Sequence, residues 1–164
     1  MKNLYLIRHA KSDWDNPKLS DRERPLNKRG KRDAPKMAAI LHEKNIDPQL
    51  LISSPSVRTM TTAKYFCEEL KYDYNKINVD NNIYLASLET LISIIKNMND
   101  NLNSVIMFAH NPGITELVNN LSKKKVNNVP TCGIAAISFE VDHWNEINKS
   151  NSSLVFFDYP KRYK

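Results

Sequence analysis

Four side chains of this sequence have the chemistry to bind or attack a phosphate group, three directly after apolar runs typical of strands and one in the first turn of the helix that follows such a run. They are Arg8, His9, Arg58 and His110. The fork-shaped donors of arginine match phosphate oxygens, and a neutral imidazole can act as a nucleophile or a hydrogen-bond donor. Each residue alone is more often structural, so the prediction of a phosphate site depends on the four meeting at one place.

A layered fold would bring them together. Apolar runs predict strands at residues 4–7, 50–53, 105–109, 134–141 and 154–159, with a weaker one at 77–79. Between them, apolar residues recur every three or four positions, which predicts helices at residues 27–43, 57–70, 88–95 and 114–121. This alternation predicts an α/β fold of three α/β/α layers, with a mainly parallel central sheet flanked by helices. We expect one domain over residues 1–164.

The strand ends define where a ligand would bind. In open α/β sheets, ligands bind at the edge where the carboxyl ends of parallel strands meet. Ser54-Pro55 and Asn111-Pro112 each place a capping side chain before a proline, so we expect helices to begin there. Free N–H groups at such helix starts add positive partial charge. The sequence therefore predicts an anion site at this edge.

The composition excludes several classes of protein. The 164 residues are 41% hydrophobic and 26% charged, which argues against collagen-like, low-complexity and largely disordered chains. No apolar run approaches the roughly 18 to 20 residues of a membrane helix, and residues 1–8 lack the apolar stretch of a signal peptide. We expect a cytoplasmic protein with no membrane association, in which Cys67 and Cys132 are free thiols.

Most of the formal charge of +6 lies in one segment, since residues 8–32 hold nine Lys or Arg against four Asp or Glu. An excess of positive charge favours anionic partners. The simpler interpretation of residues 18–32 is a solvated loop and helix face. The functional interpretation is a basic rim that steers an acidic phosphoprotein towards the site. The cations concerned are Lys18, Arg22, Arg24, Lys28, Arg29, Lys31 and Arg32.

Four blocks, in order, resemble the motifs of the histidine phosphatase (phosphoglycerate mutase-like) superfamily. LYLIRHAKSDW at residues 4–14 resembles its Arg-His-Gly motif, with Ala10 in the place of the glycine. LNKRG at 26–30 is similar to its Leu-Thr-x-x-Gly helix start, SSPSVRTMTTA at 53–63 to its second arginine motif, and AHNPG at 109–113 to its second histidine motif. The short chain without a cap insertion looks most like the compact SixA-type phosphohistidine phosphatases.

The resemblance implies a phosphoglycerate mutase-like fold without a cap domain and a phosphatase that uses no cofactor and no metal. It implies that His9 is the nucleophile that accepts the phosphoryl group, and that Arg8, Arg58 and His110 enclose that group. It also places Ser12 among the substrate-binding residues. Nearby cations should favour the neutral form of His9, and a carbonyl on its other ring nitrogen could fix the tautomer. Which nitrogen is phosphorylated stays open.

Two departures from the family pattern bear on the substrate. Asp15 follows the tryptophan where many members carry asparagine, and we leave it out of the pocket because it would repel phosphate. Residues 83–87 lack the glutamate that protonates an alkoxide leaving group in mutases and sugar phosphatases, and the simplest role of the nearby Glu89 is a first-turn helix acid. A positioned acid commonly contributes about 10² to 10⁴ in rate. Its absence favours phosphohistidine in a protein, or an aryl phosphate.

Two other functions stay open. One is a small-molecule phosphomonoesterase that acts on a sugar phosphate or nucleotide, with Glu89 as its acid. The other is a non-catalytic module that binds phosphate or nucleic acid. Against nucleic acid, the basic segment has no interleaved aromatic residues and the chain has no recognisable nucleic-acid motif. The sequence identifies neither the protein partner nor the oligomeric state.

Overall fold

Six strands form one sheet in the order β3-β2-β4-β1-β5-β6. In the computed structural model, which describes residues 1–163, the strands are β1 (Lys2–Arg8), β2 (Leu50–Ser53), β3 (Asn78–Val79), β4 (Ser104–Ala109), β5 (Ile134–Phe139) and β6 (Ser152–Asp158). β4 lies between β1 and β2 and is parallel to both, and β3 is parallel to β2. β5 runs antiparallel to its neighbours β1 and β6, so the sheet is mainly parallel.

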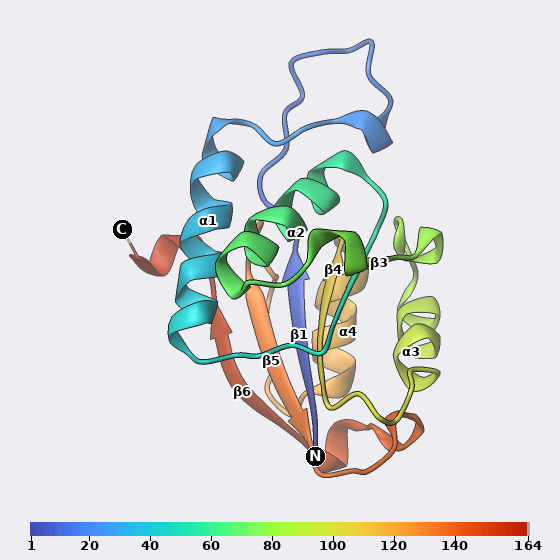
Figure 1. Ribbon diagram of the computed structural model, residues 1–164. Coiled ribbons are helices and arrows are strands. Elements are labelled where there is room, and N and C mark those ends of the chain that lie inside the picture. The colour runs from blue at the N-terminus through green and yellow to red at the C-terminus, as the bar shows by residue number, and fades with distance from the viewer. Residues whose placement is uncertain (164) are drawn as a thin grey trace.

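Four α-helices cover the two faces of this sheet (Figure 1). They are α1 (Lys28–Glu43), α2 (Val57–Leu70), α3 (Leu88–Lys96) and α4 (Gly113–Leu121). Side chains alternate along a strand, so Ile106 and Phe108 of β4 join the core with α1 and α2, whereas Val105 and Met107 join the core with α3 and α4. Burial on both faces explains why β4 is apolar throughout. The predicted three-layer architecture is confirmed, and residues 1–163 contain no cap domain.

Both predicted helix starts are wrong in their capping residue. The N-cap of α2 is Ser56, whose hydroxyl accepts from the backbone N–H of Thr59, because the hydroxyl of Ser54 is hydrogen-bonded to a histidine instead. α4 begins at Gly113, and Pro112 stands at its N-cap with no side-chain hydrogen bond. The amide of Asn111 is used elsewhere, since its Nδ2 donates to two acceptors in the loop after α4.

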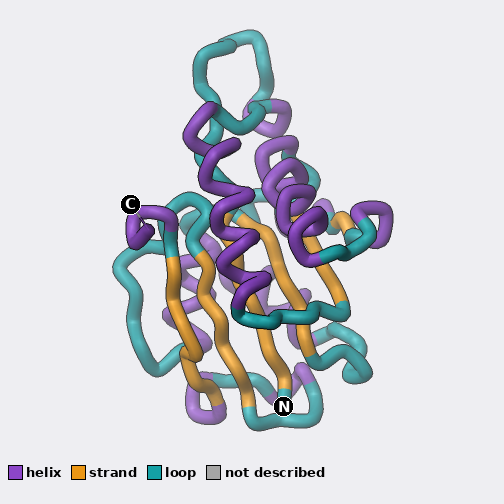
Figure 2. The backbone as a smooth tube through the Cα atoms, turned by 60° about the vertical axis from the view of Figure 1, so that its left-hand side comes forward, coloured by secondary structure: helices purple, strands orange, loops and turns teal. Residues whose placement is uncertain are grey.

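A long segment between β1 and α1 passes over the end of the sheet where the parallel strands finish. It contains a short 3-10 helix, η1 (Asp21–Glu23), and its backbone is tied together by a bridge between Ser12 and Leu26. Figures 1 and 2 show this segment projecting beyond the sheet at the top of the molecule. Side chains of this segment can therefore contact the residues at the carboxyl ends of the parallel strands.

The predicted state of the cysteines is confirmed, because Cys67 and Cys132 are both buried and free. None of the helices described in residues 1–163 has both the length and the apolar character needed to cross a membrane.

Candidate active site

The rings of His9 and His110 lie side by side where β1 and β4 end. The two strands pair with Arg8 opposite Ala109, so the residue after each strand leaves the sheet at the same level. The ring centroids are 5.2 Å apart and the ring planes are inclined at 54°. Both side chains are almost fully buried, with 7% and 4% of their surface exposed. Two imidazoles separated by a hundred residues in the sequence are thus placed in one site.

A backbone hydrogen bond determines which nitrogen of His9 carries the proton. Nδ1 lies 2.8 Å from the carbonyl oxygen of Ala10, which can only accept, so Nδ1 is the donor and Nε2 keeps its lone pair. Burial, with smaller contributions from the charges of His110, Arg58 and Arg8, lowers the pKa of His9 to about 3, although the hydrogen bond to Ala10 opposes this shift. At neutral pH, His9 is a neutral imidazole whose Nε2 can act as a nucleophile.

Two neighbours orient the ring of His110. Nη2 of Arg58 lies 3.4 Å from Nδ1 of His110, and a guanidinium can only donate, so Nδ1 accepts. Nε2 then donates to the hydroxyl of Ser54 at 2.7 Å. Burial and the nearby charge of Arg58 together lower the pKa of His110 to about 4, although the carboxylate of Asp21 acts in the opposite direction. Since a hydroxyl can both donate and accept, Ser54 is compatible with a proton on either nitrogen of His110.

Arg58 enters the site from the first turn of α2 and is anchored by the segment above it. Its Nη1 donates to the backbone oxygen of Asp21 at 2.7 Å, and its Nη2 donates to the carboxylate of the same residue at 3.1 Å. Only 4% of Arg58 is exposed. One residue of the segment between β1 and α1 therefore fixes the position of this guanidinium.

The carboxylate of Asp21 also accepts hydrogen bonds from two other side chains. It accepts from Nη1 of Arg24 at 2.6 Å and from the hydroxyl of Tyr84. Burial raises the pKa of Asp21, but the hydrogen bonds from Tyr84, Arg58 and Arg24 outweigh burial and lower the pKa to about 2. The ring of Tyr84 in turn packs edge-on against His110, with centroids 5.5 Å apart. Asp21 is therefore a permanently ionised anchor at neutral pH.

Arg8 contributes a second positive charge to the site. Its Nη1 donates to the carbonyl oxygen of Val129 at 3.1 Å, while its buried Nε has no hydrogen-bond partner within residues 1–163. Burial lowers the pKa of Arg8, and the nearby charge of Arg58 lowers it further. A buried donor without an acceptor costs about 1–3 kcal/mol. An anion bound between the two guanidiniums would relieve the repulsion between them.

Ser12, which the resemblance places among the substrate-binding residues, lies beside Arg24. It is buried, and its hydroxyl accepts a hydrogen bond from Nη2 of Arg24. The same guanidinium donates through Nε to the carbonyl oxygen of Asp13 at 3.1 Å and lies 3.2 Å above the ring of Trp14. In this structure, the hydroxyl of Ser12 helps to hold Arg24, which in turn holds Asp21.

Asp15, which the sequence analysis left out of the pocket, and Glu89, the candidate acid of the alternative function, both lie on the surface. Asp15 is exposed, and Glu89 is exposed in the first turn of α3. Within residues 1–163, the side chain of neither residue makes a hydrogen bond or an ion pair. Glu89 therefore has the predicted position of a first-turn helix acid.

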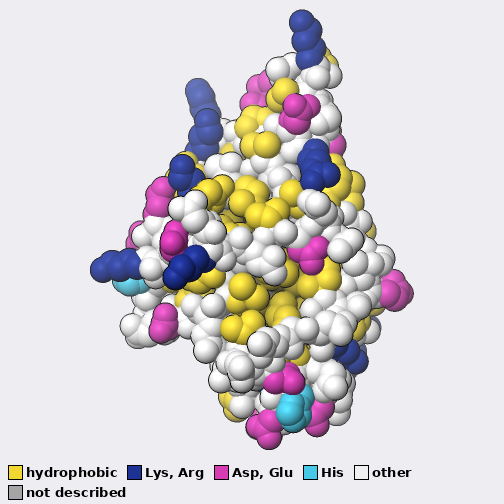
Figure 3. Space-filling view, turned by 45° about the vertical axis from the view of Figure 1, so that its right-hand side comes forward, with side chains coloured by type: hydrophobic (Ala, Val, Ile, Leu, Met, Phe, Trp, Pro, Cys, Tyr) yellow, Lys and Arg dark blue, Asp and Glu magenta, His cyan; other side chains and the backbone are white. Residues whose placement is uncertain are grey.

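The predicted basic rim divides into separate groups. Arg24 is buried beside Asp21, and Arg22 lies over the ring of Tyr84 while its Nη2 donates to Asn81. The side chains of Lys18, Lys28, Lys31 and Arg32 are exposed. Lys and Arg side chains project from the upper end of the molecule in Figure 3, where the segment between β1 and α1 lies.

The sequence did not identify three residues of this cluster. Asp21 is one of four acids in a basic segment, Tyr84 stands in the stretch that lacks a glutamate, and Ser54 has the sequence context of a helix cap. Nothing in their spacing separates them from surface residues. Among residues 1–163, no three His, Cys, Asp or Glu side chains are grouped so that they could hold a metal ion.

Comparisons with known proteins give the chain a family and a fold. Residues 4–83 match the model of the histidine phosphatase superfamily (branch 1). An uncharacterized chloroplastic protein of Arabidopsis thaliana is 31% identical over 153 residues, which cover 88% of this chain and 70% of that protein.

Solved structures are similar over almost the whole chain. The protein histidine phosphatase SixA complexed with tungstate superimposes with a TM-score of 0.83 at 20% identity, covering 99% of both chains. A mycobacterial glucosyl-3-phosphoglycerate phosphatase complexed with VO3 has a TM-score of 0.72 at 15% identity, covering 97% of this chain and 100% of that one. These similarities show the phosphoglycerate mutase-like fold.

Proposed function

Because the chain belongs to the histidine phosphatase superfamily and is a phosphatase, we propose that it hydrolyses phosphohistidine in a protein through a phospho-His9 intermediate. The observation that carries this proposal is the state of His9. Its Nδ1 is bonded to the carbonyl oxygen of Ala10, its pKa is lowered to about 3, and its Nε2 is left with a free lone pair. A neutral imidazole oriented in this way is a nucleophile at neutral pH.

In the first step, Nε2 of His9 attacks phosphorus and the P–N bond of the substrate breaks. The bonding electrons leave with the substrate imidazole, which takes up a proton from solvent and departs as a neutral ring. Arg8 and Arg58 stabilise the charge spread over the phosphoryl oxygens in the transition state. Water then attacks the phosphorus of phospho-His9, inorganic phosphate leaves, and His9 returns to its neutral state.

His110 donates to the phosphoryl group only after its protonation changes, because its Nδ1 accepts from Arg58 and its Nε2 donates to Ser54. A bound dianion raises the pKa of a neighbouring imidazole. Protonated His110 donates from both nitrogens. In the neutral state, rotation of the Ser54 hydroxyl allows it to donate to Nε2, so that the proton lies on Nδ1, on the side of Arg58, and can be donated to a phosphoryl group held by Arg58. Ser54 therefore supports the donor role of His110 in either state.

The carboxyl groups around the site favour a leaving group that departs without a strong general acid. Asp21 lies in the site, but its pKa of about 2 leaves it ionised, and its oxygens accept hydrogen bonds from Arg58, Arg24 and Tyr84. Glu89 is exposed on α3. An alkoxide needs a positioned acid far more than a protonated imidazole does. Phosphohistidine and aryl phosphates therefore suit this site better than sugar phosphates.

A protein substrate also fits the surroundings of the site. Trp14 is 70% exposed on the segment above the site, with the guanidinium of Arg24 against its ring. Exposed lysines of the basic segment, Lys18, Lys28 and Lys31, carry no ion pair within residues 1–163. We assign these cations to the steering of an acidic phosphoprotein towards His9.

A substrate panel tests the proposal. Wild type and Glu89→Gln are assayed with a phosphohistidine protein, an aryl phosphate, a sugar phosphate and a nucleotide. We expect turnover of the first two substrates, with the variant within about twofold of wild type. Selective turnover of the sugar phosphate or the nucleotide, together with a loss of about 10² or more in Glu89→Gln, would instead identify a small-molecule phosphomonoesterase. Absence of any turnover and of any phosphoenzyme would identify a binding module.

A further inference from the structure

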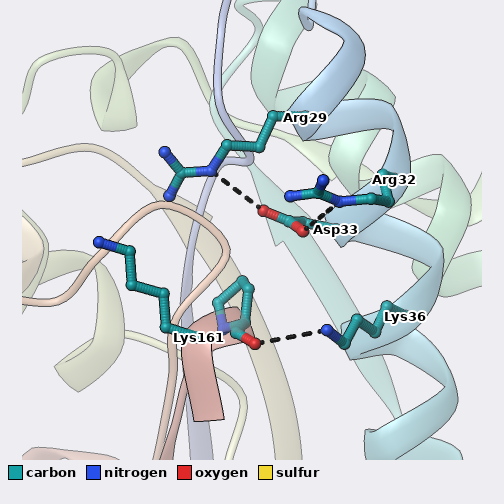
Figure 4. A pocket seen from close by; sticks show the side chains of 6 residues that line it. Arg29, Arg32, Asp33, Lys36 and Lys161 are labelled. Carbon is teal, nitrogen blue, oxygen red and sulfur yellow. Dashed lines mark hydrogen bonds and ion pairs between the residues drawn. The ribbon is translucent and has the colours of Figure 1, made fainter. Parts of the chain in front are cut away.

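A second group of cations surrounds a cavity between α1 and the 3-10 turn η6 (Pro160–Tyr163), and it shares no residue with the His9 cluster. The cavity has a volume of about 440 Å³ and is drawn in Figure 4. Its lining consists of Arg29, Arg32, Asp33, Lys36, Pro160 and Lys161. We propose that this cavity binds a chain of linked phosphates, with inorganic pyrophosphate as the simplest example.

The buried carboxylate of Asp33 arranges two arginines of α1 at the wall of the cavity. Nε of Arg29 lies 3.5 Å from one oxygen of Asp33, and Nε of Arg32 lies 3.4 Å from the other. Asp33 is only 1% exposed, and both contacts are made by Nε, the guanidinium nitrogen nearest the aliphatic stem. The terminal nitrogens stay available, and paired N–H donors of this kind bind phosphate oxygens in a bidentate manner.

Lys36 fixes the opposite wall. Its Nζ donates to the carbonyl oxygen of Tyr163 at 2.8 Å and to that of Pro160 at 3.4 Å, which holds η6 against α1. Lys161 stands between these two residues in the sequence. Figure 4 shows its ammonium group and the guanidinium of Arg29 extending towards the same side of the cavity. Lys36 therefore positions the turn, whereas Arg29, Arg32 and Lys161 are the groups placed to bind an anion.

The charge of the lining and the volume of the cavity indicate the class of ligand. Four cationic side chains face one carboxylate, so the lining carries an excess of positive charge that an anion would neutralise. A water molecule occupies about 30 Å³, so a cavity of about 440 Å³ has room for more than one phosphate group. The six lining residues include no aromatic ring on which a base could stack. These features favour recognition of the phosphate chain itself, either free or carried by a nucleotide.

Isothermal titration calorimetry at low salt tests this site with pyrophosphate, orthophosphate, ATP and a hexaglutamate peptide. Four proteins are compared: wild type, Arg58→Ala, the pocket variant Arg29→Ala/Lys161→Ala, and the control Lys28→Ala/Lys31→Ala, which removes the same amount of charge from residues of α1 that do not line the cavity. Arg58→Ala separates this site from the one around His9. Circular dichroism verifies that each variant is folded, and Arg29→Lys/Arg32→Lys keeps the charge while removing the forked donors.

The pocket variant should bind pyrophosphate at least tenfold more weakly than wild type, whereas Arg58→Ala and the control should stay within about threefold. The lysine variant should show an intermediate loss, and orthophosphate should bind more weakly than pyrophosphate. If ATP binds as tightly as pyrophosphate, the natural ligand is a phosphate chain carried by a nucleotide. If ATP binds more weakly, the natural ligand is free pyrophosphate. Unchanged affinity in the pocket variant, loss of all binding in Arg58→Ala, or tighter binding of the peptide would overturn the proposal.

Discussion

Arg58 and Asp21 form a two-point contact that joins the first turn of α2 to the segment above the sheet. The guanidinium donates to the backbone oxygen of Asp21 at 2.7 Å and to its carboxylate at 3.1 Å. Since Asp21 also accepts from Arg24 and Tyr84, the position of Arg58 depends on a network that does not touch the phosphoryl group in the proposed mechanism. Asp21 is therefore a positioning residue.

Replacement of Asp21 by alanine should weaken catalysis without removing any group that touches substrate. Arg58 would lose an acceptor, and a misplacement of about 1 Å can cost about 10² in rate. We expect the kcat/KM of Asp21→Ala for an aryl phosphate to fall roughly 10- to 100-fold. Asp15→Ala is the control, because Asp15 is an exposed acid in the same segment. Equal kcat/KM values for the two variants would contradict the role given to Asp21.

Ser54→Ala should reduce activity by disturbing His110. The mutation removes the 2.7 Å contact to Nε2 of His110 and leaves that nitrogen without its partner. Ser53→Ala is a matched control, because Ser53 is equally buried and its hydroxyl donates to the carbonyl oxygen of Ser54. Both variants should lose about 1 kcal/mol of stability. Only Ser54→Ala should also lose about tenfold in kcat/KM, and a similar loss in both would show that the effect is structural.

The low pKa of His9 predicts how stability depends on pH. The folded pKa is about 3 and the unfolded value is 6.5, so between these values the unfolded chain binds a proton that the native protein does not. Stability therefore rises with pH across this window and is lost as the pH falls. Relative to His9→Asn, wild type should lose about 1.4 kcal/mol per pH unit between pH 6 and pH 4. The stability of both proteins is measured by urea unfolding at each pH. If wild type and His9→Asn lose stability equally as the pH falls, the pKa of His9 is not lowered.

Charge reversal tests whether the basic segment steers a protein substrate. The triple variant Lys18→Glu/Lys28→Glu/Lys31→Glu should lower the kcat/KM for a phosphohistidine protein about tenfold at low salt and leave an aryl phosphate unaffected. Reversal of Lys123, Lys124 and Lys125 makes the same change in net charge after α4 and serves as the control. An equal fall in kcat/KM for both substrates, or in both triple variants, would contradict the proposed steering of the protein substrate.

The strands and helices could be predicted from the sequence because their apolar periodicity is strong. Every predicted element is present, and the ends differ by at most two residues. The meeting of His9 and His110 also follows from the sequence, because each residue directly succeeds a buried strand and the parallel pairing of β1 with β4 aligns their ends. Position along a strand is thus enough to place these two side chains.

The supporting contacts could not be predicted, because they depend on side chains that meet only after folding. Ser54 was expected to cap a helix, yet its hydroxyl bonds to His110 and Ser56 caps α2 instead. Asp21 reaches Arg58 across 37 positions, and Tyr84 reaches Asp21 across 63. No periodic pattern in the sequence predicts such contacts. Geometry was also needed to identify Nε2 as the free nitrogen of His9, through the bond from Nδ1 to the carbonyl oxygen of Ala10.

Rapid-quench trapping of the phosphoenzyme tests the central claim most directly. Wild type is mixed with ³²P-labelled phosphohistidine protein and quenched within milliseconds. The enzyme is then separated from the substrate protein and analysed for bound phosphate. The account predicts an acid-labile, alkali-stable label on Nε2 of His9 that forms and decays at the rate of turnover, and no label or turnover in His9→Asn. A label of the same amount in His9→Asn, or full turnover by that variant, would contradict it.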